Sequence, residues 1–284
     1  MSLPNSWVDT QIEMPPTNRI VPHAMSHGQN TMDSLHSLHG GELERRKLVA
    51  AAAERNKHAI LEALVPVAHR IIERADERVD VLEVASGTGQ HAFAIAEALS
   101  SQPLESAVSA STPTVPVFIH PSDLPSDDGF GSIRAYAADH RNRRLRDGVA
   151  VTMEHPIPLD CSSPEMVRVA RQAAGVDHFD LILCVNMTHI APIEATEGLI
   201  ASSGELLRVG GALAIYGPFT DERGRFTSDS NESFDKSLRA RNPQWGYRSL
   251  ALLDELCRDA GLHLESRLDM PANNFMSVWR RTAP

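Results

Sequence analysis

The stretch VLEVASGTGQHAFAIAEAL, residues 81–99, decides the fold of this chain. It runs from an apolar segment typical of a buried strand, through a turn with two glycines, into an alanine-rich segment typical of a helix. A glycine turn between a strand and a helix lets backbone N–H groups approach a ligand, and such turns usually hold a nucleotide. The stretch therefore predicts a nucleotide site.

The alternation of apolar strands and helical segments continues beyond this stretch. Five apolar strands separated by helices predict a parallel sheet that is covered on both faces. The further strands are expected within residues 115–120, 149–157, 179–187 and 211–217, and the helices within residues 130–140, 163–175, 193–207 and 249–261.

The end of the chain departs from this alternation. Residues 262–270 and 274–281 are both strand-like, with only the PANN link between them, which predicts an antiparallel pair. A parallel sheet that ends in a hairpin is the architecture of class I methyltransferases, whereas dinucleotide-binding domains end in another parallel crossover. We therefore predict an α/β fold with a Rossmann-like, seven-stranded, mostly parallel sheet, a terminal antiparallel hairpin and helices on both faces.

Length and composition bound the domain organisation. The chain has 284 residues, of which 42% are hydrophobic, enough for one large core. Residues 1–41 are rich in Pro, Ser, Asn, Met and His, so we expect an N-terminal arm that is extended or partly disordered. Residues 42–284 are predicted to form the remaining domain, which opens with a helical stretch, residues 42–74, that Pro66 breaks or bends.

Charge and cysteine content argue against several kinds of partner. The 37 acidic and 27 basic side chains give a net charge of -10, which repels a phosphate backbone, so we expect no nucleic-acid partner. The basic run HRNRRLRD, residues 140–147, is expected to be a solvated loop. Three scattered cysteines and the histidines of the arm predict no metal site. Because no segment resembles a signal peptide or a membrane span, we expect a cytoplasmic protein without a membrane partner, of unknown oligomeric state.

The glycine turn by itself allows two cofactors or a purely structural role. A dinucleotide fingerprint has a third glycine three residues after Gly89, where this chain has Ala92, a tolerated replacement. Glu83, inside the strand before the turn, suits the ammonium group of a methionine moiety and repels a pyrophosphate. With the terminal hairpin, this acid favours S-adenosylmethionine over NAD. The contacts predicted around the turn are Glu83, Ser86, Gly87, Thr88, Gly89 and His91.

Two aspartates extend the predicted cofactor site. An acid at the end of the second strand commonly binds the ribose hydroxyls, and Asp123 stands there once the Ser/Pro-rich insertion, residues 100–116, is allowed for. Asp160, after the third strand, can accept a hydrogen bond from the adenine amino group. Either residue could instead stabilise a turn or cap a helix.

The end of the fourth strand supplies the candidate catalytic residues. Asn186 offers both a donor and an acceptor, and Met187 can pack on the adenosine. His189 titrates near neutral pH and could act as a general base, position the acceptor or simply pack or cap a helix. Methyl transfer needs mainly alignment of the reacting atoms, so a base is not required.

The segment after the fifth strand is a candidate lid over the acceptor. Asn231, Phe234, Asp235 and Leu238 recur at helical spacing, so they share one face, although plain packing on the sheet explains them equally well. Asn273 and Asn274 lie in the hairpin link, where turn geometry also favours asparagine. The residues predicted to bind the acceptor are Tyr216, Asn231, Asp235, Trp245, Asn273 and Asn274.

Several longer motifs resemble those of a known family. They are, in order, AAAERNKHAIL, EVASGTGQHA, HPSD, VNMTHIAP, YGPF, SNESFDKSLRARNPQWGYR and MPANN. In these motifs, from about Ala51 to Arg281, the chain resembles a domain-of-unknown-function family of class I methyltransferase-like proteins, the methyltransferase-like 26 family. The resemblance implies a fold that binds S-adenosylmethionine and implies that Asn56 closes over the methionine carboxylate. The family's tryptophan before the second-strand PSD is absent, since residues 118–120 are Phe, Ile and His.

Together these patterns predict an S-adenosylmethionine-dependent methyltransferase that acts on the oxygen or nitrogen of a small-molecule acceptor. Two alternatives stay open: recruitment of the fold to a reaction in which no methyl group moves, and a non-catalytic cofactor-binding protein. An NAD-dependent oxidoreductase is a further alternative, but the sequence lacks an evident hydride-transfer dyad.

Overall fold

The computed structural model describes residues 40–101, 115–147 and 151–283. The predicted arm and the insertion at residues 100–116 therefore lie almost wholly outside the described residues. The helices are α2 (Gly40–Arg46), α3 (Ala51–Ile72), α4 (Gln90–Ser101), α5 (Asp127–Asp147), α6 (Met166–Ala174), α7 (Ile193–Leu206), α8 (Asp229–Arg241), α9 (Leu250–Asp259) and the short η1 (Thr188–Ile190) and η2 (Pro271–Asn273). The strands are β1 (Val79–Val84), β2 (Val117–Asp123), β3 (Val151–Met153), β4 (Ile157–Pro158), β5 (Phe179–Val185), β6 (Leu207–Gly217), β7 (Phe219–Thr220), β8 (Arg248–Ser249), β9 (Leu262–Met270) and β10 (Asn274–Arg281).

The sheet has the predicted topology. Its strand order is β3-β2-β1-β5-β6-β10-β9, and β4 pairs with β2 beside this path. The pairs from β3 to β6 are all parallel, while β10 is antiparallel to both β6 and β9. The predicted mostly parallel sheet with a terminal antiparallel hairpin is confirmed. Because β1 is followed on one side by β2 and on the other by β5, the strand order reverses at the glycine turn, where ligands of such sheets bind.

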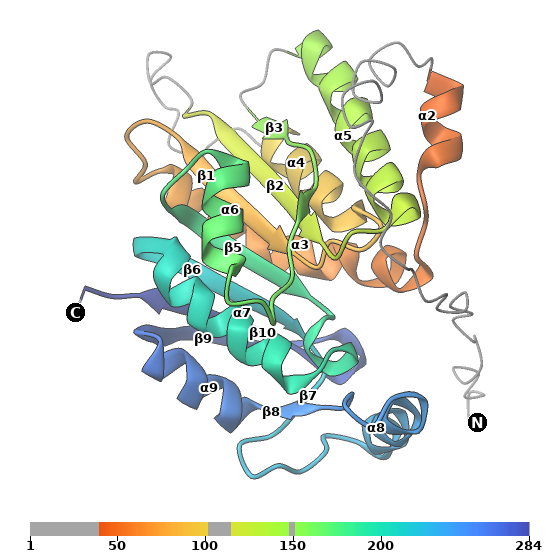
Figure 1. The fold of residues 1–284 in the computed structure, drawn as a ribbon, viewed down its shortest axis with the longest axis vertical. Helices are drawn as coiled ribbons and strands as arrows, with labels where there is room; N and C mark the ends of the chain where they lie inside the picture. Colours follow the sequence, from red (N-terminus) through yellow and green to blue (C-terminus); the bar gives the residue numbers. More distant parts are fainter. Residues whose placement is uncertain (1–39, 102–114, 148–150, 284) are drawn as a thin grey trace, which may run out of the picture. The chain divides into compact units, whose positions relative to one another are not determined.

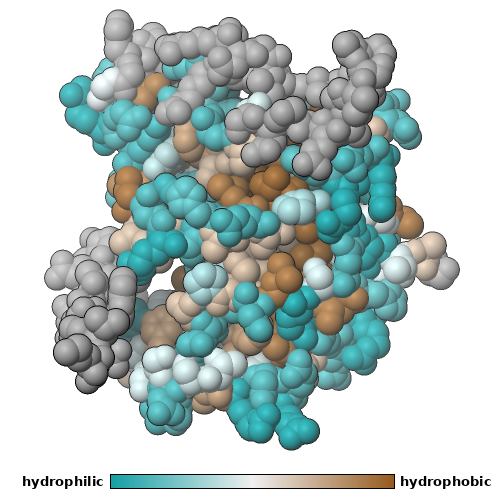
Figure 2. Space-filling model, turned by 180° about the vertical axis from the view of Figure 1, so that it is seen from behind, coloured by the Kyte–Doolittle hydropathy of each residue, from teal (hydrophilic) through white to brown (hydrophobic). Residues whose placement is uncertain are grey.

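Helices cover both faces of the sheet, which is why its central strands are buried throughout rather than alternately exposed. All six residues of β1 are buried. Side chains such as Val81 pack with α3, α4 and α5, and those such as Leu82 pack with α6, α7 and α9. In Figure 1 α6, α7 and α9 lie in front of the sheet, and α3 and α4 lie behind it. Figure 2, the view from behind, shows an apolar band in the middle of that face with hydrophilic residues around it.

The first helices differ from the prediction at Pro66. This residue lies inside α3, which continues unbroken for 22 residues, and the interruption falls instead at residues 47–50. A proline removes one helical hydrogen bond, but packing of the neighbouring Leu64 and Val67 in the core keeps the helix intact. A break at Pro66 is therefore wrong, and the alternative of a bend at this residue stays a prediction.

Two other segments also differ from the sequence prediction. The basic run at residues 140–147 is the last part of α5 and not a loop. Its first residue, His140, is buried, with Nδ1 2.8 Å from Glu97 Oε1. The predicted third strand divides into β3 and β4, since the residues between them leave the ladder on β2. Asp160 therefore follows β4, whose Pro158 pairs with Asp123 at the end of β2.

Candidate functional site

The glycine turn joins β1 to α4 with three left-handed residues. Ala85, Gly87 and Gly89 have φ angles of 58°, 57° and 86°. The turn is held to the next strand, because the Ser86 N–H donates to the Ser122 carbonyl at 2.8 Å. Gly87 follows β1 directly and is exposed. The turn therefore lies at the surface, at the carboxyl edge of the sheet.

The two glycines have different reasons to be glycine. A Cβ on Gly87 would meet no atom within 4 Å, so open space lies above this residue, and its φ is the constraint. A Cβ on Gly89 would lie 3.1 Å from Ile133 of α5. Close packing of the turn against α5 is therefore one reason for glycine at position 89, and the ligand contact of Gly89 stays a prediction.

Asp123, at the end of β2, reaches back to this turn. Its Oδ2 accepts the Gly87 N–H at 2.6 Å, and its Oδ1 accepts the Leu124 N–H at 2.7 Å. Burial raises the pKa of the Asp123 carboxyl, and the two backbone donors act in the opposite direction. An acid at the end of the second strand thus stands directly beside the glycine turn, as the sequence predicted.

Asp160 follows on the same edge. The Leu159 N–H donates to the Asp123 carbonyl at 2.9 Å, so the two aspartates belong to adjoining segments. Asp160 is exposed, and its Oδ1 accepts from the N–H and the hydroxyl of Ser162 at 2.9 and 2.6 Å. It therefore stabilises a turn, the alternative left open by the sequence, while its adenine contact stays a prediction.

Glu83 is the least satisfied acid of the site. Its side chain is 1% exposed, and within the described residues neither carboxylate oxygen has a hydrogen-bond partner. The Ser86 and Ser122 hydroxyls donate instead to the Glu83 backbone carbonyl. Burial raises the pKa of Glu83 to about 7, and the charge of Asp123 adds to this effect. The nearby Ser86 hydroxyl and Ala92 N–H act in the opposite direction, although neither makes a hydrogen bond of normal geometry to the carboxylate. A buried carboxylate without donors is costly unless a cation or donor completes it.

A short segment ahead of α3 is tied onto the turn by two side chains. Gln90 Oε1 accepts the Ala50 N–H at 2.6 Å and the Thr88 hydroxyl at 2.8 Å. The Ser132 hydroxyl donates to the Thr88 carbonyl at 2.7 Å and accepts the Leu48 N–H at 2.9 Å. These contacts hold residues 48–50 against the glycine turn, and sequence reasoning missed them because partners about 40 or 84 residues apart leave no local pattern.

A polar cluster from four elements adjoins this segment. His91 Nε2 lies 2.8 Å from Asn56 Oδ1, and the Tyr216 hydroxyl has the Asn56 and Asn274 side chains beside it. Burial, with a contribution from the nearby Lys57 charge, lowers the pKa of His91 to about 4, so its imidazole is neutral. Two predicted cofactor residues and two predicted acceptor residues are thus brought together.

The end of β5 carries the predicted catalytic pair. Asn186 has a φ of 59°, and its N–H donates to the Tyr216 carbonyl at 2.9 Å. His189 is 6% exposed, and its Nδ1 has no hydrogen-bond partner among the described residues. Burial lowers the pKa of His189 to about 4, with the charges of Arg248 and Arg241 acting in the same direction. Met187, the predicted adenosine contact, is buried beside them.

Most side chains of the predicted lid make contacts within the chain. Asn231, Asp235 and Leu238 of α8 are buried, whereas Phe234 is 41% exposed. Asp235 Oδ1 accepts the Tyr247 N–H, and its Oδ2 accepts from Arg239, each at 2.7 Å. Both carboxylate oxygens are therefore used within the chain, and of the four residues Phe234 alone lies outside the buried face.

Contacts of the remaining predicted acceptor residues are mostly internal. Asn231 Nδ2 donates to the Asn273 carbonyl at 3.3 Å, so α8 touches the hairpin link. Asn273 has a φ of 55°, the turn geometry that asparagine tolerates. Trp245 packs against the Arg241 guanidinium, 5.8 Å from its ring centroid. Their binding of an acceptor stays a prediction.

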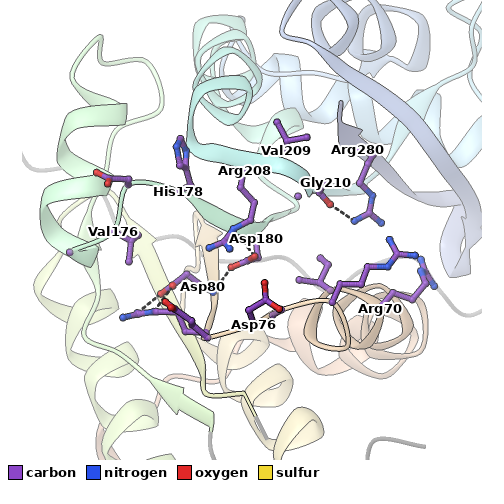
Figure 3. A pocket seen from close by; sticks show the side chains of 18 residues that line it. Arg70, Asp76, Asp80, Val176, His178, Asp180, Arg208, Val209, Gly210 and Arg280 are labelled. Atoms are coloured by element: carbon purple, nitrogen blue, oxygen red, sulfur yellow. Dashed lines mark hydrogen bonds and ion pairs between the residues drawn. The ribbon is translucent and has the colours of Figure 1, made fainter. Parts of the chain in front are cut away.

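A cavity of about 730 Å³ lies at the opposite, amino edge of the sheet (Figure 3). Its charged walls are largely paired, since Asp180 accepts the Asp80 N–H and contacts Arg208, each at 2.8 Å. Arg78 and His120 both contact the Asp80 carboxylate. This network completes itself without a ligand, unlike the Glu83 carboxylate.

Two negative findings apply to the described residues. None of their helices combines the length and the apolar character that a membrane crossing requires. They contain no group of three or more His, Cys, Asp or Glu side chains arranged to hold a metal ion.

Comparison with known proteins finds a matching family and structures of similar fold. Residues 47–281 match the model of a family described as a protein of unknown function, DUF938. A structure called a pericyclic reaction enzyme has a TM-score of 0.51 and 13% identity, over 75% of this chain and 46% of that chain. The C52A variant of LepI, in complex with SAH and a substrate analogue, has a TM-score of 0.50 and 13% identity, over 76% of this chain and 46% of that chain.

An O-methyltransferase family protein from Burkholderia thailandensis has a TM-score of 0.49 and 16% identity, over 86% of this chain and 67% of that chain. The chain thus spans less than half the length of the pericyclic reaction enzyme and of the LepI variant. At these identities the likeness concerns the fold alone, an α/β fold with a mostly parallel sheet. The narrower resemblance to methyltransferase-like 26 stays a prediction.

Proposed function

Since the chain belongs to the DUF938 family, whose function is unknown, we propose from the site that it binds S-adenosylmethionine and transfers a methyl group to a small-molecule acceptor. The observation that carries the proposal is the Glu83 carboxylate, buried under the glycine turn with neither oxygen hydrogen-bonded among the described residues. A ligand with an ammonium group or several donors would satisfy it, whereas a pyrophosphate would add repulsion. This donor requirement fits the methionine part of the cofactor.

The other cofactor residues suit the remaining parts of the same molecule. Asp123, fixed by two backbone N–H groups, is an acceptor for ribose hydroxyls, and Asp160, whose Oδ1 accepts from Ser162, offers its Oδ2 to the adenine amino group. Asn56 and His91 are neutral and already in contact, and the Asn56 amide nitrogen can donate to a carboxylate. We also include in this site Ser86, Gly87, Thr88, Gly89, Asn186 and Met187.

The bound cofactor would supply an electrophilic methyl group, so the chain has to align an acceptor and exclude water. His189 and Asn186 lie after β5, next to the strand that carries Glu83. The neutral His189 imidazole can accept a hydrogen bond from an acceptor hydroxyl or amine through its free Nδ1. With a pKa of about 4 it is a weak base, which favours a positioning role over strong base catalysis.

Isothermal titration calorimetry with S-adenosylhomocysteine tests the proposal. Wild-type protein is expected to bind it. Asp123→Asn is expected to bind it 10- to 100-fold more weakly, because the two charge-assisted hydrogen bonds from the ribose hydroxyls become weaker neutral ones. Asp76→Asn, the same change at the exposed amino edge of the sheet, is the matched control and is expected to bind normally.

Binding of NADH in place of S-adenosylhomocysteine would refute the proposal. Normal cofactor binding together with no methylated product from a broad acceptor panel would favour one of the non-methylating alternatives. That outcome would leave the cofactor assignment intact.

A further inference from the structure

The segment between α2 and α3, residues 47–50, is fixed by side chains of the neighbouring helices, and we call it the strap. Leu48 is held at both of its backbone groups. Its N–H donates to the Ser132 hydroxyl at 2.9 Å, and its carbonyl accepts from the Tyr136 hydroxyl at 3.3 Å. Both partners belong to α5. Because the strap is neither helix nor strand, these side chains take the place of a regular backbone ladder.

The first residue of the strap is anchored by a buried charge. The Lys47 side chain is 6% exposed, and its ammonium lies 2.7 Å from Glu44 and 2.5 Å from Asp139. The same ammonium lies 5.2 Å from the Phe93 ring centroid and 5.0 Å from the Tyr136 ring centroid. An ammonium group that is largely out of water needs such partners, so Lys47 fixes the start of the strap on α2, α4 and α5.

The side chains that hold the strap also hold the glycine turn. Ser132 Oγ, which accepts the Leu48 N–H, donates to the Thr88 carbonyl at 2.7 Å. Gln90 Oε1, which accepts the Ala50 N–H at 2.6 Å, also accepts the Thr88 hydroxyl at 2.8 Å. Because the strap and Thr88 share two hydrogen-bonding partners, they lie close together, and a movement of one disturbs the other.

The two middle side chains of the strap are apolar and exposed. Leu48 and Val49 are exposed by 44% and 66%. Gly87, the residue before Thr88, is also exposed, and a Cβ there would meet no atom within 4 Å. Its N–H donates to Asp123, the proposed acceptor for the ribose hydroxyls. A molecule that lies over Gly87 can therefore reach the exposed strap, and fixing the strap in advance lowers the entropy lost on binding.

We infer that the strap is a wall of the proposed cofactor site, with Leu48 and Val49 in contact with the bound molecule. Ser132 and Gln90 are the residues that position this wall. The inference rests on the proposed function, since the molecule that covers the strap is the cofactor or its product, S-adenosylhomocysteine. The two side chains add apolar contact that the polar residues of the site do not supply.

Hydrogen exchange of the strap amides tests whether the bound molecule covers them. If the strap has to open before S-adenosylhomocysteine can leave, ligand at about 100 times its Kd slows exchange of the Leu48 and Ala50 amides by up to about 100-fold, and we expect at least about tenfold. The Gly175 amide is the control, because it donates to the Arg171 carbonyl at 2.9 Å beside the amino-edge cavity. Its exchange rate is expected to stay unchanged.

Serine variants test the apolar contact itself. Leu48→Ser and Val49→Ser are each expected to weaken S-adenosylhomocysteine binding about three- to fivefold in calorimetry, because each removes apolar area that the complex buries. Leu268→Ser and Val209→Ser are the matched controls. Leu268 on β9 is exposed by 44%, the same as Leu48, and Val209 beside the amino-edge cavity is exposed by 58%. Both controls are expected to bind normally, with losses of Tm similar to those of the strap variants.

Ser132→Ala tests the positioning role. This variant loses the hydrogen bonds to the strap and to the turn, so Leu48 exchange is expected to become faster. Val49→Ser made in this background is expected to weaken binding less than it does in the wild type. Ser203→Ala is the control background, because Ser203 is equally buried and its hydroxyl donates to a carbonyl of its own helix at 2.7 Å. An equal effect of Val49→Ser in both backgrounds overturns the positioning role.

The outcomes separate this inference from the proposed function. Normal S-adenosylhomocysteine binding overturns the inference alone if the strap amides exchange at an unchanged rate. It also does so if Leu48→Ser and Val49→Ser weaken binding no more than the controls. Absence of S-adenosylhomocysteine binding overturns the proposed function, and this inference with it.

Discussion

Gly198→Ala tests how α7 fixes the turn that carries Asp160. Gly198 lies inside α7, and a Cβ there would stand 1.8 Å from the Cys161 carbonyl oxygen and 3.0 Å from its carbonyl carbon. The obstacle is backbone, which cannot rotate away as a side chain can. The turn or the helix must therefore move by more than 1 Å to accept one methyl group.

The expected loss combines two opposing effects. Replacing glycine by alanine inside a helix contributes about 1 kcal/mol of stability. Overpacking costs about 1–3 kcal/mol and occasionally more, and contact at 1.8 Å belongs at the upper end of that range. The free energy of unfolding should fall by about 2 kcal/mol, which lowers Tm by roughly 4–8 °C.

Gly131→Ala is the matched control. Gly131 lies inside α5, and a Cβ there would meet nothing within 4 Å, so only the helix-propensity gain of about 1 kcal/mol applies. Urea unfolding should therefore separate the two variants by about 3 kcal/mol. S-adenosylhomocysteine affinity should fall in Gly198→Ala only, because the Asp160 turn moves. Equal stability of the two variants would refute the reasoning.

Three further predictions concern buried polar groups. Gln90→Ala removes the acceptor of the Ala50 N–H and is expected to cost about 1–3 kcal/mol in urea unfolding, with faster hydrogen exchange of that amide; an unchanged exchange rate would contradict the tether. Glu83→Gln removes a carboxyl whose folded pKa, about 7, lies above its ordinary 4.5, so wild-type stability is full below about pH 4.5 and is lost as pH rises through 7. The variant should therefore gain up to about 3 kcal/mol relative to wild type between pH 4.5 and pH 8 while binding S-adenosylhomocysteine more weakly, and parallel stability curves would contradict this. Asp80→Asn breaks a buried ion pair and should cost about 3 kcal/mol or more in thermal unfolding at pH 7. Burial opposes ionisation of Asp80, but its histidine and arginine partners hold its pKa below the ordinary value, so the difference between the two proteins should shrink as pH falls below about 4; a constant difference would count against the ion pair.

Local sequence determined the elements and the position of the proposed cofactor site. The switch from the apolar residues of β1 to the alanines of α4 across Gly87 fixed a strand, a turn and a helix, because each part depends on residues adjacent in the chain. Parallel strands share a carboxyl edge, so Glu83 near the end of β1, Asp123 at the end of β2 and Asp160 after β4 had to lie on the same side. The PANN link likewise required β9 and β10 to be antiparallel neighbours.

Which contacts and hydrogen-bond partners each side chain has was decided only by the tertiary structure. Local reasoning allowed Pro66 either to break or to bend a helix that core packing keeps unbroken, and it gave no sign that Gly89 packs against Ile133. Asp235 could not be recognised as already paired, nor Glu83 as unpaired, since their surroundings come from segments far apart in the chain. A residue's type and spacing follow from sequence, but whether its polar atoms are satisfied depends on which distant segments the fold brings within about 3 Å.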